Sequence, residues 1–232
     1  MKNIIICGAS KNLGKYIFDK FSEQNKVFGI SRSKINKKNY FSADLNFSIQ
    51  AKKIFNKIKK KVKKIDAIIF CVGNSKRNYK KFPKTIDFTH SFNSNFYPFV
   101  NLLNCYSNIF KEKPVKFIVI SSIAGLANIN APITYSVAKN ALNFYCMISA
   151  KELAKKNIFL NIISPGNIIM DNNNWSKKLK KNPKLVKKYI YNNVPSNKFC
   201  TADEIYKMCD LIVSNKTNFV GSNIVMDGGQ IL

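Results

Sequence analysis

Short apolar stretches alternate with helical patterns along the whole chain, and this alternation constrains the fold more than any other feature of the sequence. The stretches are nearly continuous in their apolar character, as expected for parallel strands that are covered on both faces. The pattern therefore predicts an α/β fold, a doubly wound parallel sheet with helices on both faces. The expected strands are Asn3–Cys7, Lys26–Ile30, Ala67–Cys71, Lys116–Ser121, Ile158–Ile163 and Asn223–Met226.

The segments between these strands have helical patterns, and nothing in the sequence marks a second domain. We find no internal repeat, low-complexity linker or shift of composition, and 232 residues are enough for one α/β domain with a substantial core. We therefore expect a single domain over residues 1–232. The expected helices lie near Leu13–Ser22, Ile49–Lys60, Asn95–Phe110, Tyr135–Lys155 and Ala202–Ser214.

The formal net charge of +27 is the most unusual bulk property of the chain. The lysines are spread along the sequence, and no aromatic residues are interleaved with them in a nucleic-acid-binding motif. We interpret the charge as compositional bias and expect no nucleic-acid partner, with attraction to an anionic partner as the alternative interpretation.

The cysteines and the hydropathy pattern exclude several classes of protein. None of the six cysteines forms a Cys-x-x-Cys pair, and only His90 could join them, so we expect no metal site and no disulfide framework. No stretch of about 18 apolar residues is present, and the apolar run at the N-terminus is too short for a secretory signal. The sequence thus predicts no membrane span and a cytoplasmic location.

The first strand leads into a turn with two glycines, Gly8 and Gly14, at the start of a helix. Glycines let the backbone approach a pyrophosphate closely, and the N-terminus of a helix offers free N–H groups and positive potential. A glycine pair at this spacing is common at turns from a strand to a helix. Its place after the first strand favours a loop that binds a dinucleotide.

The end of the second strand bears on the choice of cofactor. Enzymes that prefer NAD usually place an acidic residue here, but residues 29–34 contain none. Ser31 and Arg32, together with Lys11 from the first loop, can instead hold a 2′-phosphate through charge-assisted hydrogen bonds. We therefore expect NADP(H) to be favoured over NAD(H).

Tyr135 and Lys139 are four residues apart in an expected helix, so both side chains can reach one site. A nearby ammonium group favours the phenolate and lowers the pKa of a tyrosine. This spacing is common by chance. Ser121-Ser122 at the end of a strand, followed by Gly125, adds a third polar group and favours the interpretation of the pair as catalytic.

These motifs together resemble the short-chain dehydrogenase/reductase family, and the resemblance runs from end to end. In that family the serine falls thirteen residues before the tyrosine, which selects Ser122 over Ser121. Asn12 departs from the second glycine of the family loop, and Met170 stands where the family often has a threonine. Further matching positions are Asp44-Leu45, Phe70-Cys71-Val72-Gly73, Pro165-Gly166 and Asp227-Gly228-Gly229.

The resemblance implies a single-domain Rossmann fold and a nicotinamide-dependent oxidoreductase. By it, Tyr135 donates a proton, Ser122 binds the reacting oxygen, Lys139 binds the nicotinamide ribose and lowers the tyrosine pKa, and Asn95, at the start of a helix, positions a water. The implied cofactor-binding residues are Gly8, Ser10, Lys11, Asn12, Leu13, Gly14, Ser31, Arg32, Asp44, Leu45, Gly73, Tyr135, Lys139, Pro165, Gly166 and Ile168.

The C-terminal half most resembles the 3-oxoacyl-acyl-carrier-protein reductase subgroup. This resemblance implies reduction of a ketone, a 3-oxoacyl thioester, to a secondary alcohol with NADPH. A reductase of sugars or other small metabolites is an alternative, and a non-catalytic nucleotide-binding regulator is an alternative of another class. Because the family commonly forms tetramers, we expect a homotetramer or homodimer, built through the helices at 95–110 and 135–155.

The segment Asp171–Lys198 is polar, rich in lysine and holds the only tryptophan, Trp175. It lies between a strand and the last helix, where α/β enzymes often place a substrate lid. We expect it to be partly helical and to close over the substrate with Trp175 as an apolar wall. A solvated surface helix is the alternative, with the substrate pocket then nearer Asn128–Ile133.

Overall fold

The computed structural model describes residues 1–75, 81–110, 114–171, 173–214 and 217–232. Its main sheet has seven strands in the order β3-β2-β1-β4-β5-β6-β9, and each pairing between them is parallel. A smaller sheet pairs β7 with β8. The strands are β1 (Asn3–Cys7), β2 (Lys26–Ser31), β3 (Tyr40–Ser42), β4 (Ala67–Phe70), β5 (Val115–Ile120), β6 (Ile158–Pro165), β7 (Ile168–Ile169), β8 (Cys200–Thr201) and β9 (Asn223–Met226).

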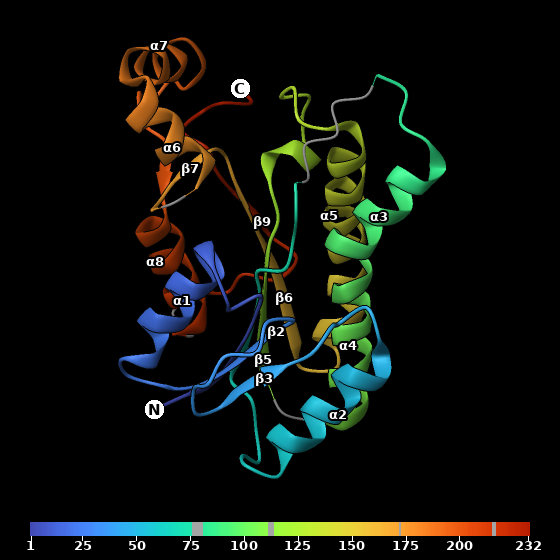
Figure 1. Cartoon of the computed structure of the whole chain (residues 1–232). Helices are drawn as coiled ribbons and strands as arrows, with labels where there is room; N and C mark the ends of the chain where they lie inside the picture. The colour runs from blue at the N-terminus through green and yellow to red at the C-terminus, as the bar shows by residue number, and fades with distance from the viewer. Residues whose placement is uncertain (76–80, 111–113, 172, 215–216) are drawn as a thin grey trace.

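Helices cover both faces of the sheet, as the sequence predicts (Figure 1). Helices α1 and α8 lie on one face, and α2, α4 and α5 lie on the other, where α3 packs beside α5. The helices are α1 (Asn12–Ser22), α2 (Ser48–Lys59), α3 (Thr85–Asn95), α4 (Tyr97–Ile109), α5 (Ile133–Ala154), α6 (Asn174–Lys181), α7 (Pro183–Asn193) and α8 (Ala202–Val213), with a 3₁₀ turn η1 (Ile123–Gly125).

The central strands are buried on both faces, which explains their unbroken apolar sequences. In β1, Ile5 belongs to the core under α2, α4 and α5, whereas its neighbours Ile4 and Ile6 belong to the core under α1 and α8. All three are fully buried, and burying an isoleucine side chain contributes about 1.5–3 kcal/mol. The two cores fix β1 at the middle of the sheet, beside β4. The strand order reverses there, and such a switch point leaves a crevice at the carboxyl ends of the strands.

The structure corrects the expected helix at 95–110. Asn95 is the last residue of α3 and not the first residue of the following helix, which begins at Tyr97 after a break at Phe96. Pro98 explains the break, because proline has no N–H and its ring clashes with the carbonyl of the fourth residue before it, so it fits only in the first turn of a helix. The helix Thr85–Asn95 and the short strands β3, β7 and β8 are additions to the predicted elements.

The segment 171–198 is partly helical, as the sequence predicts, with residue 172 outside the described part. It forms α6 and α7, which lie beyond the carboxyl end of the sheet (Figure 1). A small core of Val186, Val194 and Phe199 joins these helices, and Trp175 packs against it. Within the described ranges, no helix is both long enough and apolar enough to cross a membrane.

Candidate active site

The loop after β1 has the tight geometry that a dinucleotide cradle needs. Gly8 has φ +85°, and a Cβ atom placed there would lie 2.8 Å from the carbonyl oxygen of Cys71. A Cβ atom at Gly14 would overlap the carbonyl of Gly8. Asn12, which departs from the family glycine, has φ 49°, a left-handed conformation that asparagine tolerates well. Lys11 precedes α1 without a side-chain cap, so the first N–H groups of the helix are available to an anion.

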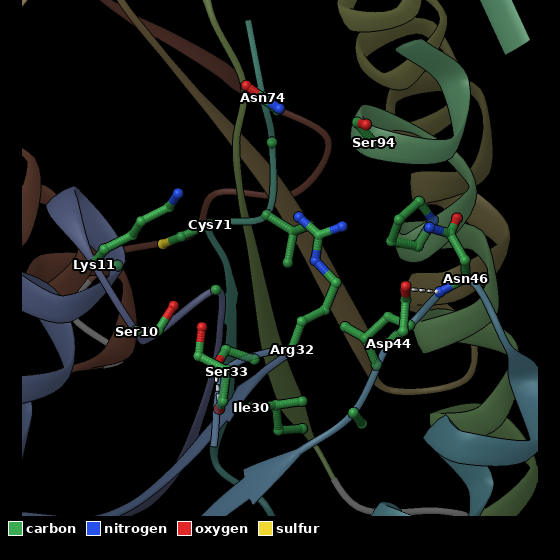
Figure 2. Close-up of a pocket in the computed structure, with 18 of the residues that line it drawn as sticks. Ser10, Lys11, Ile30, Arg32, Ser33, Asp44, Asn46, Cys71, Asn74 and Ser94 are labelled. Carbon is green, nitrogen blue, oxygen red and sulfur yellow. Dashed lines mark hydrogen bonds between the residues drawn. The ribbon is translucent and has the colours of Figure 1, made fainter. Parts of the chain in front are cut away.

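This loop forms one wall of a cavity of about 230 Å³ at the carboxyl ends of β1, β2 and β4 (Figure 2). All of the predicted cofactor-binding residues from the first half of the chain line this cavity. Ser33, Asn46, Asn74 and Ser94 also line it and were not predicted. Ser33, Asn46 and Asn74 each directly follow a predicted residue. Their place next to predicted residues at the ends of strands is the sequence signal that could have identified them. The predicted lining residues are Gly8, Ser10, Lys11, Asn12, Leu13, Gly14, Ser31, Arg32, Asp44, Leu45 and Gly73.

Hydrogen bonds hold the turn that presents Arg32. The Tyr40 hydroxyl donates to Ser31 Oγ at 2.8 Å, and Ser31 Oγ donates to the carbonyl of Ser33 at 3.1 Å. Tyr40 fits because Gly29 has no side chain; a Cβ atom there would lie 2.5 Å from the tyrosine ring. The guanidinium of Arg32 extends into the cavity (Figure 2), and it has no ion pair within the described ranges. It is therefore available to an anionic group of a ligand.

Ser122 and Tyr135 line a second, larger cavity of about 600 Å³. Ser122 Oγ accepts a hydrogen bond from the N–H of Ala124 at 3.2 Å, which fixes the serine at the start of η1. Gly125 lets η1 pack against α5, because a Cβ atom there would lie 2.6 Å from the backbone of Lys139. The glycine thus brings the serine at the end of β5 beside the tyrosine of α5.

Lys139 lies behind Tyr135 in the interior. It is 3% exposed, its Nζ donates to the carbonyl of Ile120 at 3.2 Å, and the same nitrogen lies 5.9 Å from the centre of the Tyr135 ring. Burial lowers the pKa of Lys139 to about 8. Burial also raises the pKa of Tyr135, and its hydrogen bond with Ser122 offsets only part of that effect. The net direction of the Tyr135 pKa shift is thus upward, because desolvation of the phenolate dominates, and the expected lowering by Lys139 stays a prediction.

Asn95 lies next to this pair but lines neither cavity. It is fully buried, its Oδ1 accepts from the N–H of Asn74 at 3.0 Å, and its Nδ2 donates to the Asn74 carbonyl at 3.1 Å. A Cβ atom at Gly73 would lie 3.1 Å from Asn95 Oδ1 and 3.3 Å from Lys139 Nζ. Asn95 thus fixes the chain after β4 beside the lysine.

The rest of the second cavity comes from several distant parts of the chain, among them Ser75 after β4 and Gln230 near the C-terminus. Gly166 and Ile168 follow β6, residues 128–132 precede α5, and Trp175, Lys178 and Tyr189 come from α6 and α7. Two predicted cofactor residues, Lys139 and Pro165, line neither cavity; Pro165 is buried at the end of β6. The segment 171–198 and the stretch near Asn128 therefore bound the same space. The described residues contain no cluster of histidine, cysteine and carboxylate side chains that could hold a metal.

Comparisons with known proteins agree with this geometry. Residues 18–230 match the family model described as enoyl-(acyl carrier protein) reductase. The chain is 29% identical to a 3-oxoacyl-[acyl-carrier-protein] reductase of Buchnera aphidicola subsp. Baizongia pistaciae, over 100% of this chain and 98% of the relative. The chain is 27% identical to a second 3-oxoacyl-[acyl-carrier-protein] reductase, from Buchnera aphidicola subsp. Schizaphis graminum, over 100% of this chain and 98% of that relative.

Solved structures share the fold at similar length. The structure of ElxO with NADP bound superimposes with a TM-score of 0.88 at 24% identity, over 100% of this chain and 99% of the other. The fold, the arrangement of Ser122, Tyr135 and Lys139, and the match of the family model over most of the sequence lead to one assignment. The chain belongs to the short-chain dehydrogenase/reductase family of oxidoreductases.

Proposed function

We propose that this protein uses NADPH to reduce the ketone of a 3-oxoacyl thioester to a secondary alcohol. The observation that carries the proposal is the arrangement of two cavities. The glycine loop lines the first cavity, and Ser122 and Tyr135 line the second. The cavities are adjacent, because Asn74 lines the first and the next residue, Ser75, lines the second. A dinucleotide lying along the first cavity would thus place its reactive ring beside the tyrosine.

The side chains of the second cavity supply the acid chemistry of a ketone reduction. Tyr135 keeps its proton at neutral pH, since its pKa is raised, and it donates that proton to the oxygen of the ketone. Ser122 stabilises the charge that develops on the same oxygen. Lys139 would hold the nicotinamide ribose with its ammonium group, and Asn95 holds the backbone between the two cavities. The bound cofactor supplies the hydride.

Three features support NADPH as the reductant. Arg32 reaches into the first cavity and has no ion pair with any described residue, Lys11 and four serines line the same cavity, and no acidic residue occupies positions 29–34. A guanidinium and an ammonium group together can neutralise a 2′-phosphate. The ElxO structure with NADP bound, which has the same fold, also supports this choice.

The relatives support the substrate class. Two 3-oxoacyl-[acyl-carrier-protein] reductases align with the whole of this chain. An acyl carrier protein is typically acidic, and a chain of charge +27 would attract it.

We propose further that the chain forms a homodimer or homotetramer through the outer face of α5, where Phe144, Met147 and Ile148 are more than half exposed.

One set of assays tests the function. Purified protein is incubated with acetoacetyl thioesters, sugars and simple ketones, and the absorbance of NADPH or NADH is followed. We expect turnover of the thioester with NADPH. Tight cofactor binding without turnover of any ketone would favour a nucleotide-binding regulator, and turnover of sugars alone would favour the small-metabolite reductase.

The cofactor preference is tested by Arg32→Asp. We expect this change to weaken NADPH binding by at least about tenfold and NADH binding much less, because a charged hydrogen bond to the 2′-phosphate is lost. Lys34→Asp is the matched control, since Lys34 is exposed and does not line the cavity. Tighter binding of NADH than NADPH by the unaltered protein would contradict the preference.

A further inference from the structure

Three side chains of the second cavity form a hydrogen-bonded relay. Trp175 Nε1 in the lid donates to Asn167 Oδ1 at 3.0 Å, and Asn167 Nδ2 donates to Gln230 Oε1 at 2.9 Å. All three residues line the cavity that Ser122 and Tyr135 also line. The relay therefore connects the lid, the turn after β6 and the C-terminal tail around the site where the ketone would bind.

The first member of the relay fixes its direction. An indole N–H can only donate, so the carbonyl oxygen of Asn167 must face Trp175 and its NH₂ group must face Gln230. The carbonyl of Gln230 is turned toward Asn167 for the same reason, and the backbone N–H of Asn167 also points to it at 3.5 Å. Only the NH₂ group of Gln230 is left, so the relay ends in a donor.

This terminal donor lacks an acceptor among the described residues. Gln230 Nε2 is shielded from solvent without a hydrogen-bond partner, and it packs on Gly166, where a Cβ atom would lie 2.6 Å from the nitrogen. Buried polar groups in folded proteins nearly always have a partner. An unpaired donor in the wall of a substrate cavity is therefore suited to an acceptor that enters with the substrate.

The surroundings of Gln230 favour the same kind of ligand. Lys178 lines the cavity and lies over the Trp175 ring, with Nζ 4.4 Å from the ring centre. No carboxylate is found among the described residues that line this cavity, and several of them are asparagines. The cavity thus offers donors to a ligand that is rich in oxygen atoms near its reacting ketone.

We propose that Gln230 is a specificity-determining residue whose NH₂ group donates a hydrogen bond to a second carbonyl of the substrate, close to the ketone that is reduced. The inference rests on the proposed function and deepens it, because the thioester carbonyl of a 3-oxoacyl group is separated from the ketone by a single CH₂ group. A simple ketone lacks this acceptor and leaves the amide unpaired. Selectivity then comes from the hydrogen bond that only the thioester gains, since the amide is already unpaired in the free protein.

Two substitutions test the proposal with a pair of substrates. Gln230→Glu keeps the oxygen that accepts from Asn167 and removes the donor, while Gln230→Met removes both without adding charge. Each is assayed with an acetoacetyl thioester and with a matched methyl ketone in which CH₂ replaces the thioester carbonyl. We expect kcat/KM for the thioester to fall by at least about tenfold, and that for the matched ketone to change less than about twofold.

A control separates this effect from a general effect of charge. Gln24→Glu makes the same change at an exposed residue that lines neither cavity, and it should leave both substrates unaffected. Equal losses on the two substrates would assign Gln230 a structural role, and no loss on either would exclude the contact; both results overturn the inference alone. Failure of the unaltered protein to reduce either substrate would instead overturn the proposed function.

Discussion

The Tyr135 phenol keeps its proton at neutral pH, because burial raises its pKa, while burial brings the pKa of Lys139 down to about 8. The two groups therefore carry the charges that a reduction needs, a neutral acid beside a cation. The same desolvation acts on both residues with opposite consequences, because it disfavours the charged form of each.

Removal of the Tyr135 proton tests its role as the acid. Tyr135→Phe keeps the ring and removes the proton, so we expect turnover to fall by at least about a hundredfold. Cofactor affinity, measured by fluorescence titration, should barely change. Tyr191→Phe, an exposed tyrosine on α7, is the control and should retain full activity. Near-normal turnover by the Tyr135 variant would exclude the proposed mechanism.

The charge of Lys139 gives a dependence on pH. Its pKa of about 8 means that the ammonium form is present below that pH and is lost as the pH rises through it. We expect kcat/KM for reduction to fall as the pH rises above about 8. Lys139→Arg should be less active but keep a flat profile to higher pH, because a guanidinium stays charged. An unchanged fall in that variant would assign the titration to another group.

At the scale of elements, aromatic packing joins helices α6 and α7 to the wall of the second cavity. Trp175 contacts Tyr189 of α7 with ring centres 4.9 Å apart and Phe199 at 4.7 Å, and it also faces the cavity that holds Tyr135. The tryptophan therefore belongs both to the small core of α6 and α7 and to the wall of the site. Motion of α6 and α7 would alter its environment.

Trp175→Ala tests whether the lid contacts substrate. We expect it to raise the KM for the ketone by roughly tenfold while cofactor affinity changes little, since binding energy to substrate is lost. In the unaltered protein, Trp175 fluorescence should change when cofactor and ketone bind together. Tyr191→Ala alters the exposed side of the same segment and serves as the control. Unchanged kinetics and fluorescence would make the segment a surface element.

For the whole molecule, the apolar residues of α4 and α5 divide into two groups. Phe99 and Leu103 are buried in the core, whereas Phe144 and Met147 are 57% and 55% exposed, with Ile148 beside them on the same face of α5. An exposed apolar face of this kind is typical of a surface that pairs with a second copy. From the sequence alone, Phe99, Leu103, Phe144 and Met147 could each serve either the core or an interface between copies.

Light scattering at micromolar concentration should give the mass of a dimer or a tetramer. Phe144→Glu should lower that mass, because it places a charge in the apolar contact. Phe82→Glu makes the same change at a residue that is 89% exposed and lies outside α5, and it should leave the mass unaltered. A monomer in the unaltered protein would contradict assembly through this face.

Local patterns by themselves determined much of this molecule. The unbroken apolar strands, the left-handed tolerance of Asn12 and the spacing of Ser122, Tyr135 and Lys139 each depend on neighbours a few residues away. They predicted the doubly wound sheet and a loop after its first strand that binds a dinucleotide. Pro98 is a sequence signal for a helix boundary, but the residues on both sides of it have a helical pattern. The boundary between α3 and α4 was therefore not predicted.

Only the tertiary structure decided what depends on contacts between distant segments. The upward shift of the Tyr135 pKa follows from how much protein surrounds the phenol. The orientation of the Gln230 amide follows from its hydrogen bonds with Asn167 and, through Asn167, with Trp175, and both residues lie far from Gln230 in the sequence. Burial and hydrogen-bond direction are properties of packed neighbours and not of residue type. A sequence pattern therefore places the catalytic groups, while the fold sets their protonation and the partners that they offer to a substrate.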